Sequence, residues 1–315
     1  MFLEGLLSRV LVTGGAGFVG SNLVTELLDI GLEVVVLDDL SSGYRSLIDK
    51  RAKLVEGSII DEEKLAECFE LKPDFVFHLA ALFANQNSVE NPLKDLEVNG
   101  IGTIKILENA HKAKVKKLVY TSSSCVYGNG VAMSETDKVF APDTPYAITK
   151  LLGERYCNFW SEHHGLNINT VRLFNTYGPG EYPGQYRNVI PNFIKLASQG
   201  KPLPITGTGE ETRDFTFVGD TVRALCKVLL SENQNGETFN IATGKQTTIN
   251  RIAELINGHM KNNAGIEYVP RRNWDHVKQR CAVVTKANEK LGFVSQVEIE
   301  EGVASTCEWI KLKVK

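Results

Sequence analysis

The stretch Thr13-Gly14-Gly15-Ala16-Gly17-Phe18-Val19-Gly20 decides the fold. An apolar run at 10–13 leads into it and a helical pattern at 17–30 follows it, which predicts a tight turn from a strand into a helix. Gly14 permits the sharp turn, Gly17 lets the backbone approach a pyrophosphate, and Gly20 lets the helix pack closely on the strand. The N–H groups at the helix N-terminus favour phosphate, so the stretch predicts a dinucleotide site.

The first half of the chain repeats this alternation. Strand-like runs at 33–37, 74–79, 117–122 and 168–173 alternate with helical patterns at 61–71, 91–113 and 146–165. We therefore expect an α/β protein with a doubly wound parallel sheet, the Rossmann arrangement. After residue 174 glycine and proline become frequent, with helical patterns at 190–198, 220–230 and 249–261. We assign 1–174 to the Rossmann domain and 175–315 mainly to a smaller C-terminal α/β lobe, with parts of the later chain returning to the first domain.

Composition excludes several classes of protein. The chain has 315 residues, is 43% hydrophobic and carries a net charge of −3, which gives no reason to expect nucleic acid or a membrane surface as partner. Glu4 and Arg9 interrupt the first apolar segment, so we expect no signal peptide and a cytoplasmic location. The six cysteines contain no Cys-x-x-Cys pair, which favours reduced thiols and no metal site.

An acidic residue at the end of the second strand indicates which dinucleotide binds. Asp38 directly follows that apolar run, roughly 20 residues beyond the glycine turn. A carboxylate there accepts hydrogen bonds from ribose hydroxyls and repels a 2′-phosphate, so it favours NAD over NADP. Its neighbour Asp39 is the alternative, and either residue could simply cap a loop.

Tyr146 and Lys150 are four residues apart and share one face of a predicted helix. A lysine ammonium and a positive nicotinamide ring favour a phenolate, which can act as general base on a sugar hydroxyl. Thr121-Ser122-Ser123-Ser124 ends another predicted strand, where a serine could hydrogen-bond the reacting oxygen, although any one of them could be an ordinary polar turn.

These motifs together resemble the extended short-chain dehydrogenase/reductase superfamily, in its NAD-dependent nucleotide-sugar epimerase and dehydratase branch, and most closely the UDP-glucose 4-epimerase type. The resemblance covers nearly the whole chain. The residues that carry it are 14–20, Asp38, His78-Leu79-Ala80-Ala81, Asn99, 122–128, Tyr146, Lys150, 172–179 and Arg213-Asp214-Phe215.

The resemblance implies a role for each matching position. Tyr146 corresponds to the general base, Lys150 to its activator and Ser123 to the hydrogen-bonding residue, because it lies five residues before Gly128. The implied NAD-binding residues are Gly14, Gly17, Phe18, Val19, Asp38, Asp39, Ser58, Ile59, Leu79, Ala80, Ala81, Asn99, Tyr146 and Lys150. The implied nucleotide-sugar-binding residues are Ser123, Ser124, Tyr146, Asn175, Asn188, Val189, Pro204, Ile205, Arg213 and Arg272.

The implied reaction is inversion of one sugar hydroxyl through a transient keto sugar, at C4 of a UDP-hexose, by a homodimer paired through the helices at 91–113 and 146–165. Dehydratases of the branch carry an Asp-Glu pair after the catalytic threonine, and decarboxylases usually keep the glutamate. Ser124 and Cys125 stand there instead, which disfavours the two alternatives, a 4,6-dehydratase and a UDP-glucuronate-type epimerase or decarboxylase. A non-catalytic NAD-binding module is a further alternative, which the complete Ser123, Tyr146 and Lys150 set disfavours.

The segment around Arg272 departs from the pattern of the branch. Trp274 stands where a glycine is usual, and the distance to Lys286-Ala287 is slightly longer. Arg280 falls near a position that limits sugar size in related epimerases. It could bind a carboxylate, as on a uronic acid, or narrow the pocket.

Overall fold

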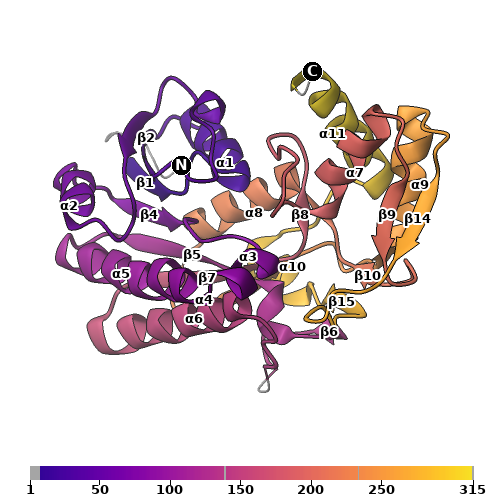
Figure 1. Cartoon of the computed structure of the whole chain (residues 1–315). Helices are drawn as coiled ribbons and strands as arrows, with labels where there is room; N and C mark the ends of the chain where they lie inside the picture. The colour runs from indigo at the N-terminus through magenta and orange to yellow at the C-terminus, as the bar shows by residue number, and fades with distance from the viewer. Residues whose placement is uncertain (1–7, 138–139, 233, 314–315) are drawn as a thin grey trace.

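A parallel sheet of seven strands forms the centre of the molecule, in the order β12-β7-β5-β4-β1-β2-β3 (Figure 1). The computed structural model describes residues 8–137, 140–232 and 234–313. The five predicted runs form β1 (Arg9–Thr13), β2 (Glu33–Asp38), β4 (Phe75–His78), β5 (Lys117–Ser123) and β7 (Ile168–Leu173). The predicted doubly wound α/β fold is therefore confirmed.

Two strands of this sheet were not predicted. β3 (Lys53–Glu56) is a short edge strand with one buried side chain, so its apolar signal is weak. β12 (Thr238–Ile241) comes from the second half of the chain and pairs with β7, Phe239 opposite Val171. The later chain thus returns to the sheet, as expected.

Helices cover both faces of the sheet. Val10 and Val12 point into a core shared with α1 (Phe18–Asp29), α8 (Val218–Leu230) and α10 (Thr285–Leu291), whereas Leu11 points into the opposite core. The opposite core is covered by α2 (Glu62–Glu70), α5 (Thr103–Lys112) and α6 (Pro145–His164). This double burial explains the continuous apolar runs of the strands.

The predicted helix at 91–113 is divided. It consists of α4 (Pro92–Asp95), a π-helical turn η2 (Leu96–Gly102) and α5, and α3 (Asn85–Glu90) precedes it. π-turns inside helices often accompany functional sites. Here Asn99, within the turn, accepts a hydrogen bond from the Leu82 backbone at 2.7 Å.

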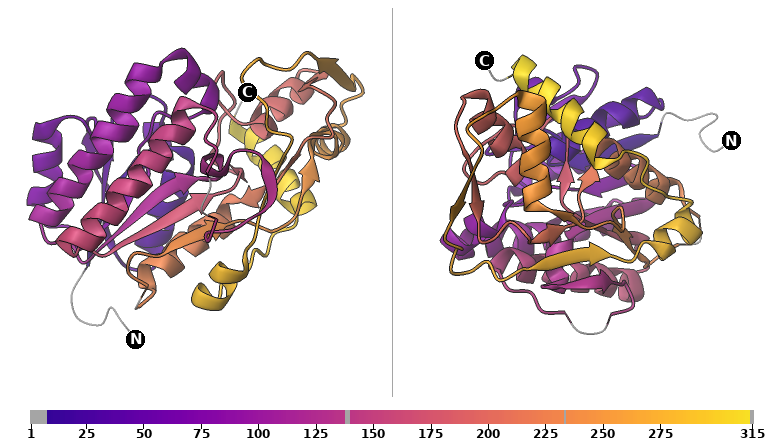
Figure 2. Two further views of the ribbon diagram at one scale, coloured as in Figure 1. Left: turned by 90° about the horizontal axis from the view of Figure 1, so that it is seen from below. Right: turned by 90° about the vertical axis from the view of Figure 1, so that its right-hand side faces the viewer.

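The second lobe has its own apolar core, built by α7 (Val189–Ser198), α9 (Ile249–Met260) and α11 (Ile299–Lys313) (Figure 2). β9 (Leu203–Thr206) pairs with β14 (Ile266–Val269), and β8 (Thr176–Tyr177) with β11 (Thr216–Phe217). A third sheet has the order β13 (Thr247–Thr248), β10 (Thr212–Arg213), β15 (Gln279–Ala282), β6 (Gly130–Met133). Because β6 comes from the first half, residue 174 does not separate the two parts cleanly, and the domain division stays a prediction.

In the described part of the chain, no helix combines the length and the apolar character that a membrane crossing needs. Residues 1–7, which contain Glu4 and much of the segment used to judge a signal peptide, lie outside the described residues. Two short 3₁₀ turns, η1 (Arg45–Leu47) and η3 (Ser124–Tyr127), complete the elements.

Candidate active site

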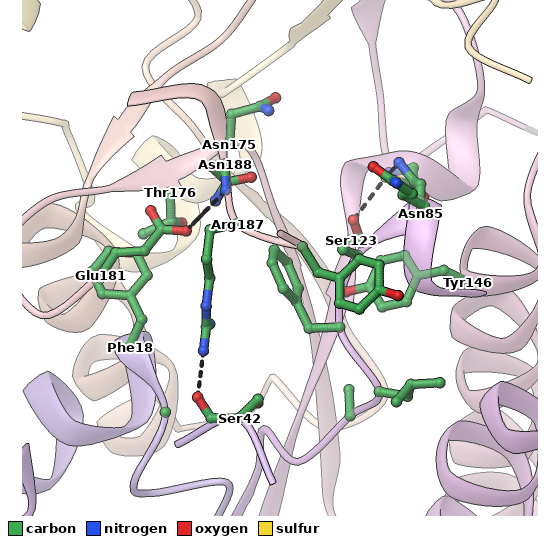
Figure 3. A pocket seen from close by; sticks show the side chains of 18 of the residues that line it. Phe18, Ser42, Asn85, Ser123, Tyr146, Asn175, Thr176, Glu181, Arg187 and Asn188 are labelled. Atoms are coloured by element: carbon green, nitrogen blue, oxygen red, sulfur yellow. Dashed lines mark hydrogen bonds between the residues drawn. The ribbon is translucent and has the colours of Figure 1, made fainter. Parts of the chain in front are cut away.

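A cavity of about 640 Å³ lies where the carboxyl ends of the sheet strands meet the second lobe (Figure 3). This edge is where open α/β sheets bind their ligands. The predicted site residues that line the cavity are Gly14, Gly17, Phe18, Val19, Asp38, Asp39, Ser58, Ile59, Leu79, Ala80, Ala81, Ser123, Ser124, Tyr146, Lys150, Asn175, Asn188, Val189, Pro204, Ile205, Arg213 and Arg272. Asn99 is the predicted residue that does not line it.

The glycine turn has the geometry that a dinucleotide requires. Gly14 has a φ of +73°, and a Cβ there would lie 2.7 Å from the Ala80 nitrogen. A Cβ on Gly20 would lie 2.1 Å from the Gly14 carbonyl oxygen, so the helix could not pack so closely with any other residue. Gly17 is the N-cap of α1 and has no side chain to cap the helix. The N-terminal N–H groups of α1 therefore remain available to a phosphate.

Asp38 and Asp39 occupy different environments. The Asp38 carboxylate is buried at the cavity wall and accepts hydrogen bonds from the Ala16 and Leu40 N–H groups, both at 2.9 Å. Burial raises the pKa of Asp38 above its ordinary value. Asp39 is exposed and accepts from the Ser41 N–H and hydroxyl, as a loop cap does. This geometry supports Asp38 as the ribose-binding residue.

Asn99 lies behind the cavity wall. The Asn99 side-chain oxygen accepts from the Leu82 N–H, and its amide nitrogen donates to the Leu82 carbonyl and, at 2.7 Å, to the Asp95 carboxylate. Leu82 itself lines the cavity. Asn99 is therefore placed to hold the loop that follows β4, and its predicted direct contact with the cofactor stays a prediction.

Tyr146 lies in the first turn of α6, is buried and lines the cavity. Thr144 caps this helix through the Ala147 N–H, and Ser88 accepts from the Tyr146 N–H at 3.0 Å. Burial raises the pKa of Tyr146 above its ordinary value, and a polar contact with Ser123 acts in the opposite direction. The predicted lowering of this pKa depends on the positive nicotinamide ring as well as on Lys150, so it stays a prediction for the enzyme with NAD bound.

Lys150 lies one turn further along α6 and is buried. Its ammonium donates to the Thr121 carbonyl at 2.9 Å and lies 5.8 Å from the centre of the Tyr146 ring. Burial lowers the pKa of Lys150 to about 8, although Asp95 opposes the shift. The fixed ammonium can stabilise negative charge that develops on the phenol.

Ser122 and Ser123, two of the three consecutive serines, have separate roles in the structure. Ser122 donates to Glu154 at 2.6 Å, and Glu154 forms a buried, two-pronged ion pair with Arg172. Ser122 is therefore committed to a structural network. Ser123 accepts from the Cys125 N–H at 3.2 Å, lines the cavity and lies beside Tyr146 in Figure 3. This position supports the choice of Ser123.

Two asparagines line the part of the cavity formed by the second lobe. The side-chain oxygen of Asn175 is buried without a hydrogen-bond partner among the described residues, as expected of a group that awaits a ligand. Asn188 donates from its backbone and side chain to Glu181, at 3.3 and 2.9 Å (Figure 3). Burial raises the pKa of Glu181 to about 7.

Three of the arginines that line the cavity bear on the predicted substrate contacts. Arg213 donates to the carbonyls of Thr212 and Val277 and lies 4.0 Å from Asp275. Arg272 is exposed and stacks over Trp274, 5.5 Å from the ring centre. Trp274, which replaces the usual glycine, thus gives Arg272 a platform. Arg280 is buried and holds the Gly128 carbonyl and the Cys125 sulfur.

The sequence did not predict some lining residues, including Asn85, Glu181 and Arg187. Asn85 accepts from Thr144 at 2.9 Å and lies 3.6 Å from the Cys125 sulfur. Its position shortly after β4 was a usable signal, because polar residues at that edge face the ligand. Glu181 and Arg187 lie in the long 178–188 connection, whose path no local pattern predicts.

A Rossmann fold whose cofactor cavity contains a Tyr-x-x-x-Lys pair defines an oxidoreductase-type enzyme of the short-chain dehydrogenase/reductase class. The model of the "NAD dependent epimerase/dehydratase family" matches residues 10–242. The chain belongs to the NAD-dependent epimerase/dehydratase family. This membership confirms the resemblance and the predicted use of NAD.

The relatives share the whole length of the chain. The UDP-glucose 4-epimerase of Mycolicibacterium smegmatis is 36% identical over 97% of this chain and 99% of its own. An epimerase structure from Methanothermobacter thermautotrophicus has a TM-score of 0.95 and 46% identity, covering 97% of this chain and 93% of that one. The UDP-glucose 4-epimerase of Thermotoga maritima, solved with UDP-glucose, has a TM-score of 0.94 and 36% identity, covering 98% and 100%.

Proposed function

We propose that the protein is an NAD-dependent epimerase that inverts C4 of a UDP-hexose, of the UDP-glucose/UDP-galactose type, through a 4-keto sugar. The observation that carries this proposal is the meeting of Ser123, Tyr146 and Lys150 in one cavity between the glycine turn and the second lobe. Relatives named as UDP-glucose 4-epimerases support the substrate class.

The cavity fits both ligands. NAD would lie along the glycine turn, with its ribose hydroxyls at Asp38 and its pyrophosphate at the N-terminus of α1. The nucleoside diphosphate would contact the lobe residues Asn175, Asn188 and Arg213, because a guanidinium suits phosphate oxygens. The unpartnered oxygen of Asn175 supports this orientation.

The chemistry that bound NAD would supply is the uptake of the C4 hydrogen as a hydride and its later return to C4. Tyr146 removes the proton from the C4 hydroxyl, Ser123 hydrogen-bonds the same oxygen, and the Lys150 ammonium stabilises the phenolate. A sugar held mainly by its diphosphate can turn over as a ketone and present its other face. Tyr146 then returns the proton to the C4 oxygen, and C4 is inverted because the hydride that bound NAD would give back reaches the opposite face of the carbon.

The alternatives make different demands on the site. Dehydration needs a further acid/base pair, and Ser124 and Cys125 occupy the positions of the usual carboxylic acids. A non-catalytic NAD-binding module does not need the complete set of Ser123, Tyr146 and Lys150. The observed arrangement therefore favours epimerisation.

A panel of UDP-sugars tests this proposal. Purified protein is incubated with each sugar and NAD, and the products are separated by chromatography. Interconversion of C4 epimers is expected. Release of a 4-keto-6-deoxy sugar would identify a dehydratase instead, and no conversion of any nucleotide sugar would defeat the proposal.

We also infer a homodimer built on α4, η2 and α6. Large apolar side chains are exposed there, with Leu93 83% and Ile148 54% exposed, together with Leu96 and Phe159. Ile148 and Phe159 share one face of α6 by helical spacing. Leu93→Glu and Ile148→Glu together should convert a dimer to a monomer in light scattering; a monomeric wild type would contradict the inference.

For the location of the enzyme we propose the cytoplasm. All six cysteines, Cys68, Cys125, Cys157, Cys226, Cys281 and Cys307, are buried free thiols, which agrees with a reducing compartment. Fractionation of the source cells, with this protein detected by antibody, tests this location.

A further inference from the structure

Arg280 presents a buried positive charge in the cavity wall. It lies on β15 and is 4% exposed. Nε and Nη2 donate to the Gly128 carbonyl at 3.0 and 2.9 Å, and Nη1 lies 3.3 Å from the Cys125 sulfur. These contacts fix the guanidinium rigidly at the cavity.

No carboxylate among the described residues forms an ion pair with Arg280. The other arginines here are balanced or solvated: Arg271 pairs with Glu211 at 2.8 Å, Arg213 has Asp275 at 4.0 Å, and Arg272 is exposed. A buried charge without a counter-ion is costly. The imbalance indicates that an anionic ligand group balances Arg280.

Arg213 increases this imbalance. β10 and β15 pair in parallel, with Arg213 directly opposite Arg280. Burial and the charge of Arg280 together lower the pKa of Arg213 to about 10. Two acidic groups act on Arg213, Asp275 and Glu211, but Glu211 is already paired with Arg271. The two neighbouring guanidinium groups therefore carry more positive charge than Asp275 balances.

A nucleotide sugar could offer Arg280 two kinds of anion, its diphosphate or a carboxylate on the sugar ring. The position of Arg280 in the cavity distinguishes between them. Cys125, which contacts Arg280, packs in one apolar cluster with Tyr146 and Ala147. Ser123 also accepts from the Cys125 N–H. Arg280 is therefore one side chain away from the residues that act on the reacting hydroxyl. This is the sugar end of the site.

We propose that Arg280 binds a carboxylate on the sugar ring, so that the preferred substrate is a UDP-hexuronic acid. This inference rests on the proposed C4 epimerisation and replaces the UDP-glucose/UDP-galactose type by a UDP-hexuronic acid as the preferred substrate. A residue that only narrows the pocket would not need to be charged, because burying a charge without a counter-ion is costly. After its bonds to Gly128 and Cys125, the guanidinium keeps one N–H on each of Nη1 and Nη2 to donate to a carboxylate.

The carboxylate contact has a chemical consequence. A uronate oxidised at C4 is a β-keto acid, and it loses CO₂ when the C5–C6 bond breaks and its electron pair moves toward the C4 ketone. A guanidinium that holds negative charge on the carboxylate opposes that movement. Arg280 would therefore protect the 4-keto sugar until Tyr146 returns the proton.

The test compares kcat/KM for UDP-glucuronate and UDP-glucose in the wild type, Arg280→Gln, Arg280→Lys and Arg272→Gln. The wild type should prefer UDP-glucuronate. Arg280→Gln should lower the UDP-glucuronate to UDP-glucose ratio at least about 30-fold, because it leaves the carboxylate without a charged partner. Arg280→Lys should retain part of the preference, and the exposed Arg272→Gln should change both substrates by the same factor.

The outcomes separate this inference from the proposed function. Equal losses on both substrates in Arg280→Gln, or a wild type that prefers UDP-glucose, would overturn the carboxylate assignment while epimerisation stands. Release of CO₂ and a UDP-pentose would uphold a carboxylated substrate but overturn both the protective role of Arg280 and epimerisation as the reaction. If Arg280→Gln does not fold, calorimetric binding of the two sugars to the wild type and Arg280→Lys decides, and equal affinities would overturn the inference.

Discussion

The ammonium of Lys150 lies 5.8 Å from the centre of the Tyr146 ring and is fixed by the carbonyl of Thr121 at 2.9 Å. The two side chains come from successive turns of α6, which Thr144 caps at its start. A charge held at this distance can stabilise a phenolate only while the amine is protonated.

Wild-type turnover should therefore fall above about pH 8, because burial lowers the pKa of Lys150 to about 8. Steady-state rates between pH 6 and 10 measure this effect. Lys150→Met should reduce turnover about 100-fold and remove this limb of the pH profile. A variant that keeps the same high-pH limb would assign the titration to another group.

Tyr146→Phe should lower turnover by at least about 100-fold, because the phenylalanine has no hydroxyl to exchange a proton with the sugar. NAD should remain bound, since the glycine turn and Asp38 are unchanged. Absorbance of the cofactor released on denaturation provides that control. Activity within a few fold of the wild type would rule out Tyr146 as the general base.

Gly20→Ala should abolish NAD retention, because its Cβ would lie 2.1 Å from the Gly14 carbonyl oxygen and displace the turn. Gly258→Ala on α9 is the matched control, since its Cβ would meet no atom within 4 Å. That control should stabilise the protein by about 0.5–1 kcal/mol. Thermal unfolding and cofactor content distinguish the two, and a Gly20→Ala protein that retains NAD would contradict the account of the turn.

The parts of the molecule predicted from sequence are those with strong local patterns. Residues 10–12 are a continuous apolar run, and Ile168–Leu173 carries the apolar residues Ile168, Val171 and Leu173. At Gly14 and Gly20 the turn has no room for a side chain. β12 was not predicted because it has only four residues and pairs with β7, a strand distant in sequence, so no local pattern indicates the pairing. The pKa of Tyr146 was predicted to fall beside Lys150 and a nicotinamide ring, whereas the sequence did not indicate that burial, which depends on the tertiary fold, raises this pKa in the protein alone.

The same limit applies within the site. The choice of Ser123 over Ser122 rested on a family spacing, whereas the structure gives a physical reason, since Ser122 is bonded to Glu154. The ion-pair balance around Arg280 depends on elements far apart in sequence, so the sequence left carboxylate binding and pocket narrowing equally open.

Glu181 should make stability depend on pH. Burial raises its pKa from 4.5 to about 7, so the folded protein binds this proton more tightly than the unfolded chain. Its contribution is present below about pH 4.5 and is lost as the pH rises through about 7, by about 3 kcal/mol. Glu181→Gln should remove this loss in denaturant unfolding at pH 5 and pH 8, whereas Glu289→Gln at an exposed site should not. Identical pH dependence in the wild type and Glu181→Gln would contradict the assignment.

Epimerisation in D₂O tests the central claim most directly. If C4 is inverted through a keto sugar, the hydrogen that leaves C4 returns to the same carbon without exchange with solvent. Mass spectrometry of the epimerised UDP-sugar should therefore show no deuterium at C4. Incorporation of one deuterium at C4 for each inversion would contradict the account.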